Sequence, residues 1–315
     1  MHASSIKSTL PRLGCSPTSG FFAPNDNIVG GDLLKNTSFS SYNSGVVELR
    51  RRLSAGLYLQ ANYVFSKVLT DFGPSTNNDQ ARFQPLLDNA QPKLERGRAP
   101  FDFNHQFKAN FTYELPIGNG HRLFASENRL VSLLVDGWQT GSIFTWQSGN
   151  PFSILSTQAT LNRAGARSSR NTAVSTISPG QIKSDTGVFV QSNGTVFVVN
   201  PSLVSSNGTG APPSNELTCV PAVTGGFCNP QPGEAGNLSL DAFTGPTYFD
   251  WDLSAAKDFH LSEHFKLTFR TEAFNVLNHP VFFIADQNIN SQQFGQSTRT
   301  VSSPRILQMS LRLKF

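Results

Sequence analysis

Asp250 and Asp252 are the residues whose spacing best suits chemistry. One residue separates them in an alternating stretch, so both carboxylates would project from the same face of a strand. Paired carboxylates can act as general acid and base, but at a strand entrance beneath a loop we favour water-facing acids or a weak cation site. His260 and His264 have the i, i+4 spacing of helical metal ligands. They flank a predicted turn between strands, where that geometry is absent.

Other catalytic signatures are equally weak. Ser148-Gly149-Asn150 lacks the flanking pattern of a hydrolase nucleophile elbow, and no Gly-rich phosphate loop is present. Cys219 and Cys228 bracket VPAVTGGF in a Gly- and Pro-rich region, which favours a local disulfide over two unpaired thiols. A zinc site is less favoured because no second Cys pair or nearby His completes a ligand set. We therefore expect no enzyme activity, no cofactor and no metal, and Cys15 has no obvious partner.

The composition favours strands and polar loops. Only 15% of the 315 residues are charged, while Phe occurs 26 times and Gly 25 times. The net charge of +4 is small, and the dense cluster Arg50–Arg52 is interpreted as a solvated strand end, so we expect no nucleic-acid partner. No apolar stretch is long enough for a membrane helix, so a membrane protein of this composition would have to be a β-barrel.

The C-terminal segment, residues 305–315, alternates strictly between apolar and polar side chains. Its apolar row is Leu307, Met309, Leu311, Leu313 and Phe315, and its polar row is Gln308, Ser310, Arg312 and Lys314. About ten alternating residues make a tilted membrane-spanning strand. Outer-membrane barrels commonly close with such a strand and a terminal aromatic residue. We therefore expect Leu311, Leu313 and Phe315 to form the assembly signal.

Six further segments have the same alternation, and their connections alternate between short and long. The predicted strands are 46–50, 57–66, 106–115, 137–147, 247–256 and 265–273; the shorter links are 53–56, 116–136 and 259–263; the long loops are 68–102, 148–246 and 276–303. Short periplasmic turns and long extracellular loops are typical of outer-membrane barrels. The sequence thus predicts an all-β fold: a partial antiparallel transmembrane β-barrel of about seven meander strands.

Domain boundaries follow from the same pattern. Residues 1–43 are predicted to be an irregular N-terminal segment, and residues 44–315 the C-terminal part of a barrel with a long extracellular loop at 148–246. Within that loop, Asn193-Gly194 between two apolar runs predicts a small hairpin, and 121–136 could include a turn of helix. The N-terminus lacks a continuous apolar core, so no signal peptide is expected in this chain.

The two faces of the strands carry different candidate residues. The predicted lumen-facing residues are Lys108, Glu114, Lys266, Arg270, Glu272 and Arg312, and the predicted membrane-interface aromatics are Trp138, Trp146 and Trp251. A sandwich core could not bury the charged row unpaired, whereas a watery lumen can hold it. A sheet with one face on a core and one in water is the alternative.

Several stretches resemble the C-terminal part of TonB-dependent receptors, particularly the Oar-like group. They are Tyr42–Ser44 with Leu49–Arg52, Ala61–Lys67, Arg98–His105, Gly137–Gln139 with Gln147–Phe152, and Arg270–His279. The resemblance implies a barrel of about 22 strands, filled by an N-terminal plug and energised through TonB. Seven strands, with no plug and no TonB box, would then make this chain a fragment.

The resemblance implies an outer-membrane receptor or transporter segment in which loops and lumen contact the ligand. Expected partners are outer-membrane lipid, the barrel-assembly machinery and, through the missing N-terminal parts, the TonB complex. The ligand could be a carbohydrate, a peptide or a metal chelate. Two alternatives remain open: a soluble carbohydrate-binding β-sandwich presenting Trp138, Trp146 and Trp251, and a surface adhesion or structural barrel without transport.

Overall fold

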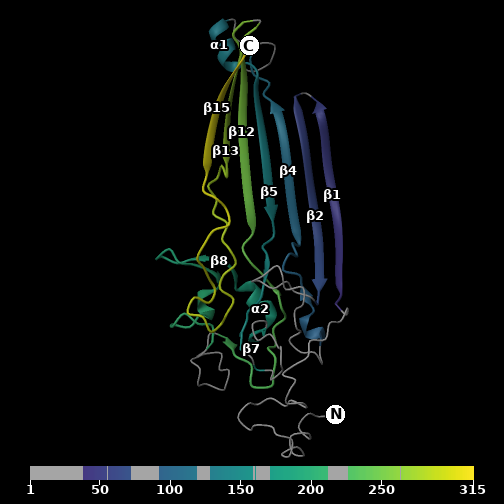
Figure 1. Cartoon of the computed structure of the whole chain (residues 1–315), viewed down its shortest axis with the longest axis vertical. Coiled ribbons are helices and arrows are strands. Elements are labelled where there is room, and N and C mark those ends of the chain that lie inside the picture. Colours follow the sequence, from purple (N-terminus) through teal and green to yellow (C-terminus); the bar gives the residue numbers. More distant parts are fainter. Residues whose placement is uncertain are drawn as a thin grey trace, which may run out of the picture.

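Seven long antiparallel strands form one continuous sheet in the computed structural model (Figure 1). They follow chain order: β1 (Ser40–Ser54), β2 (Leu57–Thr70), β4 (His105–Glu114), β5 (Trp138–Gln147), β12 (Tyr248–His260), β13 (Lys266–Phe274) and β15 (Ile306–Lys314). The two-residue β3 (Gly97–Arg98) pairs with the end of β2. The structure describes residues 38–54, 56–71, 92–118, 128–158, 160, 171–211, 226–262 and 264–315.

The sheet is not closed into a cylinder. Within the described ranges β1 pairs with β2 alone and β15 pairs with β13 alone, so both are edge strands. Neighbours in sequence are neighbours in space throughout, with no crossover. The predicted all-β, partial antiparallel barrel of seven meander strands is therefore confirmed.

Strand register separates two faces across the whole sheet. Ala109 of β4 lies opposite Ala61 of β2 and Phe144 of β5, and Phe144 lies opposite Trp251 of β12. Because directly paired residues project to the same side, the apolar rows of these strands form one continuous face. Most charged and amide side chains of the same strands form the other, and Lys67 and Lys257 are exceptions that lie in the apolar rows. We call these the apolar face and the polar face.

The connections alternate in length, as predicted. The turn after β1, the β4–β5 link and the β12–β13 turn lie at the same end of the sheet as Phe315 (Figure 1). The β4–β5 link contains the short helix α1 (Arg129–Val135), where the sequence suggested a turn of helix. The long connections lie at the opposite end.

Long connections from two parts of the chain fold into one body, here called the loop module. Its elements are β6 (Pro151–Phe152), β7 (Val174–Ser175), α2 (Pro179–Ser184), β8 (Thr186–Val190), β9 (Val196–Val199), a 3₁₀ turn (Pro201–Leu203), β10 (Phe227–Cys228), β11 (Phe243–Thr244) and β14 (Gln296–Ser297). β8 and β9 form the hairpin predicted at Asn193-Gly194. β14 comes from the 276–303 connection and pairs with β9.

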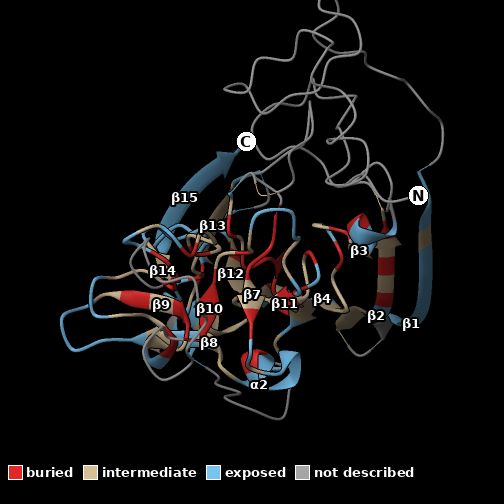
Figure 2. Ribbon diagram, turned by 90° about the horizontal axis from the view of Figure 1, so that it is seen from below, coloured by how far each residue is buried: buried red, intermediate tan, exposed pale blue. Residues whose placement is uncertain are grey.

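The loop module has its own hydrophobic core. Phe152, Phe227, Phe243, Phe294 and Ile289 are all at most 2% exposed. In the view along the strands, the buried residues concentrate in this module (Figure 2). The sequence predicted a long loop with one hairpin at 148–246; in its described residues the structure has this hairpin and also a buried core that the sequence did not indicate. The core is assembled from very short segments whose contacts are distant in sequence.

Two strand boundaries also differ from the predictions. β1 begins at Ser40, so residues 40–43, predicted to be irregular, pair with Thr70–Lys67 of β2. β2 continues to Thr70 instead of ending near Ser66. Serine, tyrosine and asparagine gave this extension no apolar alternation; pairing between the two strands holds it extended. In the described residues, no helix is long and apolar enough to cross a membrane.

Candidate functional site

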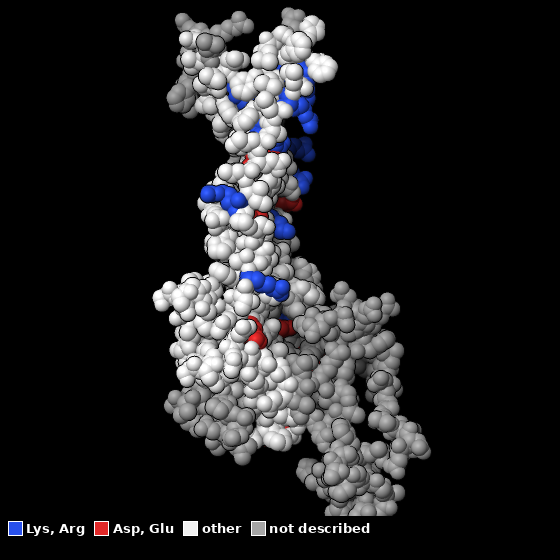
Figure 3. Space-filling model, turned by 60° about the vertical axis from the view of Figure 1, so that its left-hand side comes forward, with Lys and Arg blue, Asp and Glu red and all other residues white. Residues whose placement is uncertain are grey.

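All six predicted luminal residues lie on the polar face. Lys108 pairs across β4–β5 with Thr145, and Lys266 pairs with Lys314, which extends the row to the C-terminal strand. The remaining members, Glu114, Arg270, Glu272 and Arg312, occupy positions of the same parity. Figure 3 shows Lys and Arg side chains spread along the sheet, with little charge on the visible loop module.

The charges on the polar face are partly paired with one another. Lys266 Nζ lies 2.6 Å from Asp258 Oδ2, and Thr268 donates to the other oxygen of the same carboxylate at 2.6 Å. Arg270 lies 2.6 Å from Glu272 on the same strand. Each of these side chains keeps substantial exposure, which suits a hydrated surface and not a packed core.

Phe144 is the centre of the aromatic cluster on the apolar face. Its ring contacts Phe107, Phe249 and Trp251 in edge-on geometry, with centroids 5.3 to 6.5 Å apart. Edge-on contacts are a favourable arrangement of aromatic rings. This cluster spans β4, β5 and β12, and it covers the half of the face nearer the loop module.

The three tryptophans share the apolar face but occupy different environments. Trp138 and Trp146 stand at opposite ends of β5. Trp251 lies opposite Phe144, and its indole Nε1 donates to Ser142 Oγ at 2.8 Å. The position of Trp138 and Trp146 at the strand ends agrees with an interface role, and the assignment of all three tryptophans to the interface stays a prediction.

The C-terminal residues continue the apolar face. Leu311 lies opposite Phe269, and Leu313 lies opposite Leu267. Phe315 follows the last residue of β15 and is 95% exposed. The positions of these three residues do not test whether they act as an assembly signal, so that role stays a prediction.

Asp102 is the centre of a buried polar cluster at the loop end of the sheet. Its side chain is fully buried, and Oδ1 accepts from the backbone N–H of Val68 at 2.7 Å. Oδ2 accepts from Arg98 Nε at 2.8 Å and from Lys67 Nζ at 3.2 Å. Arg98 also donates to Thr244 Oγ1 at 2.8 Å, beside the loop module. We call this the Asp102 clamp.

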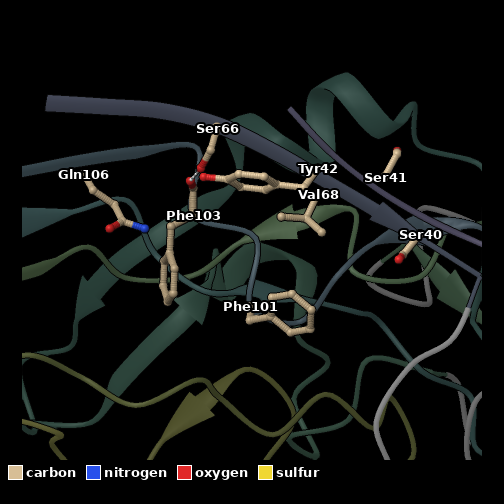
Figure 4. A pocket seen from close by; sticks show the side chains of 8 residues that line it. All are labelled: Ser40, Ser41, Tyr42, Ser66, Val68, Phe101, Phe103 and Gln106. Carbon is tan, nitrogen blue, oxygen red and sulfur yellow. Dashed lines mark hydrogen bonds between the residues drawn. The ribbon is translucent and has the colours of Figure 1, made fainter. Parts of the chain in front are cut away.

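A cavity of about 320 Å³ opens next to the clamp (Figure 4). It is lined by Ser40, Ser41, Tyr42, Ser66, Val68, Phe101, Phe103 and Gln106. Tyr42 is 62% exposed and Phe101 is 60% exposed. Register puts Tyr42, Val68 and Gln106 on the polar face, so the cavity stands at the loop end of that face.

No lining residue of the cavity carries a formal charge. In the described part of the chain, the Tyr42 hydroxyl and the Gln106 amide make no hydrogen bond, whereas Ser66 Oγ donates to the Phe103 carbonyl at 2.7 Å. Aromatic rings together with uncharged hydrogen-bonding groups suit an uncharged ligand moiety. This cavity was not predicted from the sequence. The one sequence feature that could have indicated it is the Arg98–His105 motif, because the loop of this motif forms one wall of the cavity.

Comparison with known proteins decides the class of the chain. The family model described as an outer membrane beta barrel domain matches residues 17–308. The chain belongs to this outer membrane beta barrel family. No curated protein and no solved structure matches the chain.

Membership sets an expectation for the two faces of the sheet. In outer-membrane barrels the outward face is an apolar band and the inward face is polar. We therefore expect the face built around Phe144 to be the lipid side and the face bearing Lys108 and Arg270 to be the luminal side. The family also gives the protein an outer-membrane location, which leaves the soluble β-sandwich without support.

One of the two carboxylates considered for acid–base catalysis, that of Asp252, makes a structural hydrogen bond in this barrel. Asp250 and Asp252 share one face of the strand, as predicted, which is the polar face, and Asp252 Oδ1 accepts from the Asn275 N–H at 2.9 Å. The Asn275 side chain bonds in turn to the backbone of His279 and Ser303. These bonds fix the chain where β13 leaves the sheet. His260 ends β12 and His264 follows in the turn, so they share no helix.

Cys228 lies buried in β10 and is disulfide-bonded. Its predicted partner, Cys219, lies outside the described residues, so the pairing stays a prediction. Among the residues that the structure describes, no three His, Cys, Asp or Glu side chains gather closely enough to hold a metal ion.

Proposed function

We propose that this chain forms the C-terminal strands of a TonB-dependent receptor of the Oar-like type, which takes up a ligand through its loops and lumen. The observation that carries the proposal is the uncharged, aromatic cavity where the loop end meets the luminal side. A ligand arriving from outside would meet this position before it enters the lumen. The proposed partners are the ligand, outer-membrane lipid and the barrel-assembly machinery.

The motifs that resemble this receptor group support the proposal through their structural positions. Arg98–His105 builds the Asp102 clamp and one wall of the cavity. Arg270–His279 carries luminal charges and the Asn275 bonds that fix the next loop. Both motifs therefore organise the loop end of the barrel, where a receptor selects its ligand. A plug and a TonB box supplied outside these strands would couple uptake to TonB.

The chemistry of the cavity lining favours some classes of ligand over others. With Tyr42 and Phe101 exposed and no charged lining residue, the cavity favours an uncharged ring over an anionic iron chelate. A neutral oligosaccharide has this chemistry, because its C–H faces stack on aromatic rings and its hydroxyls bond to amide and phenol groups. An uncharged peptide side chain is the other class that the same test can reveal.

Uptake measurements on intact cells that express the full receptor test the function. We expect saturable accumulation of a labelled neutral oligosaccharide that a protonophore abolishes. Phe101→Ala should reduce uptake about tenfold, equivalent to one aromatic contact of about 1.4 kcal/mol. The matched control is Phe265→Ala, which removes an exposed phenylalanine at the opposite end of the sheet and should change nothing.

Two results would contradict the proposal. Uptake that persists with the protonophore would indicate a passive channel. Cells that bind a surface glycan equally well with and without an energised membrane, and accumulate none of it, would indicate the adhesion barrel instead. Accumulation of a labelled neutral peptide in place of the oligosaccharide would keep the transporter and change its ligand.

A further inference from the structure

The helix α1 ends on the lipid side of the sheet. Trp138 Nε1 donates to the Leu134 carbonyl at 3.0 Å, and the Lys257 ammonium donates to the Asp136 carbonyl. Trp138 and Lys257 lie directly opposite each other on β5 and β12. Register places both on the apolar face, so the residues that hold the end of α1 point toward lipid. Figure 1 shows α1 at the same end of the molecule as the C-terminus.

Lys257 is an unusual residue for a row that faces lipid. It is only 2% exposed, and its ammonium lies 5.8 Å from the Trp138 ring centroid and 5.1 Å from that of Phe259. A lysine facing hydrocarbon is costly unless its charge is satisfied. Here a carbonyl oxygen and two ring faces stabilise it. Paired Trp and Lys side chains are typical of the membrane–water boundary, so this pair indicates its depth.

The turn that carries α1 is tightly fixed. Gly137, two residues after the last residue of the helix, has a φ of +73°, which favours glycine. A Cβ on Gly118 would overlap the Asp136 carboxylate, so the link packs closely against this residue. Ser132 Oγ donates to the same carboxylate at 2.5 Å. The helix is thereby held in one orientation.

Three apolar side chains of α1 are left uncovered. Leu134 is 64% exposed, Val131 41% and Leu133 39%. A seven-residue helix is too short to be stable alone in water, so it needs a surface to cover its apolar side chains. The apolar face of the sheet continues directly to α1 through Trp138. The lipid that covers this face is therefore the nearest apolar phase available to Leu134.

We propose that α1 is a membrane foot, which inserts Val131, Leu133 and Leu134 into the headgroup–acyl boundary of the periplasmic leaflet. Its occupant is lipid, because the polar anchors at its end and the exposed side chains are continuous with the lipid side. The foot fixes how deep the barrel sits. It goes beyond the proposed function, since a receptor, a channel or an adhesin would use it in the same way.

Site-specific fluorescence tests the foot in the full chain, reconstituted into phosphatidylethanolamine–phosphatidylglycerol vesicles. Leu134→Cys is labelled with an NBD fluorophore under non-reducing conditions, with the disulfide at Cys228 left intact and the remaining free cysteine changed to serine. A lipid with a nitroxide near its headgroup should quench this label at least roughly twofold, as expected for a side chain at the interface. Val188→Cys is the matched control, since Val188 is 46% exposed in the loop module, and it should remain unquenched.

A third label separates the possible failures. Met309→Cys lies on the lipid side of β15, where Met309 is 70% exposed, and its quenching is measured with a lipid that carries the nitroxide on its acyl chain, at the depth of this mid-strand residue. If Met309→Cys is quenched while Leu134→Cys behaves like Val188→Cys, the foot is contradicted and the barrel assignment stands. If neither label is quenched, the assignment of the apolar face to lipid is wrong, and the membrane foot, which depends on it, is contradicted as well.

Discussion

Arg98 Nε lies 2.8 Å from Asp102 Oδ2 in a pair whose carboxylate is fully buried. The same Arg98 reaches Thr244, and the same Asp102 accepts the N–H of Val68. One ion pair thus joins β2, the segment from β3 to β4 and the loop module. This connection couples the loops that would contact a ligand to the rigid sheet.

Removing the carboxylate should detach the loops from the sheet. Asp102→Ala leaves Arg98 and the Val68 N–H without their shared acceptor, and breaking a buried pair in this way costs about 3–5 kcal/mol. We expect faster cleavage of the loop module by an external protease and a lower unfolding midpoint. Glu48→Gln is the control, because the exposed Glu48–Arg50 pair should contribute at most about 1 kcal/mol. Equal effects of both variants would contradict the clamp.

Gly149 is required where the chain leaves β5. A Cβ at this position would stand 1.9 Å from the Gly245 carbonyl oxygen, which is backbone and cannot rotate away. Gly149→Ala should therefore destabilise the protein by about 1–3 kcal/mol. Gly180→Ala, in α2 with open space around its Cβ position, should be neutral or stabilising by up to about 1 kcal/mol. Denaturant unfolding of both variants measures the difference; a tolerated Gly149→Ala would show that the two loops do not meet here.

Loss of the disulfide at Cys228 should loosen the loop module and spare the sheet. Cys228 pairs with Val174 through β10 and β7, so its bond stabilises a buried position. We expect Cys228→Ser to cost about 2–4 kcal/mol within the module. The measurement is protease sensitivity of the module beside the strand content by circular dichroism. A parallel loss of strand content would mean that module and sheet unfold as one unit, contrary to this prediction.

The strands and their faces were readable from the sequence because period 2 is a local property. Successive residues such as Leu311 and Arg312 point to opposite faces of a strand, whichever strand pairs with it. The loop module could not be predicted, since Phe152 pairs with Phe243 and Phe197 with Gln296 across large separations, in strands of two to four residues. Such strands are too short to show a period.

The candidate site was predictable only in part. Charge and alternation correctly placed Lys108 and Arg270 on the polar face, and the motif around Asp102 was one of the stretches that resemble the receptor group. Its role was hidden, because a buried carboxylate shared by Val68 and Lys67 depends on the tertiary fold. The anchoring of α1 was equally hidden, since the predicted strand ended at residue 256, whereas β12 continues through Lys257 to His260.

A spin-label scan along β15 is the most direct test that this sheet forms part of a membrane barrel. All nine residues of Ile306–Lys314 are exposed in the structure, so a label reports its surroundings and not local packing. In lipid vesicles, labels at 307, 309, 311 and 313 should be accessible to oxygen, and those at 308, 310 and 312 to a water-soluble nickel complex. Strict alternation of the two is the predicted result. Uniform access of the nickel complex to every position would contradict a membrane barrel.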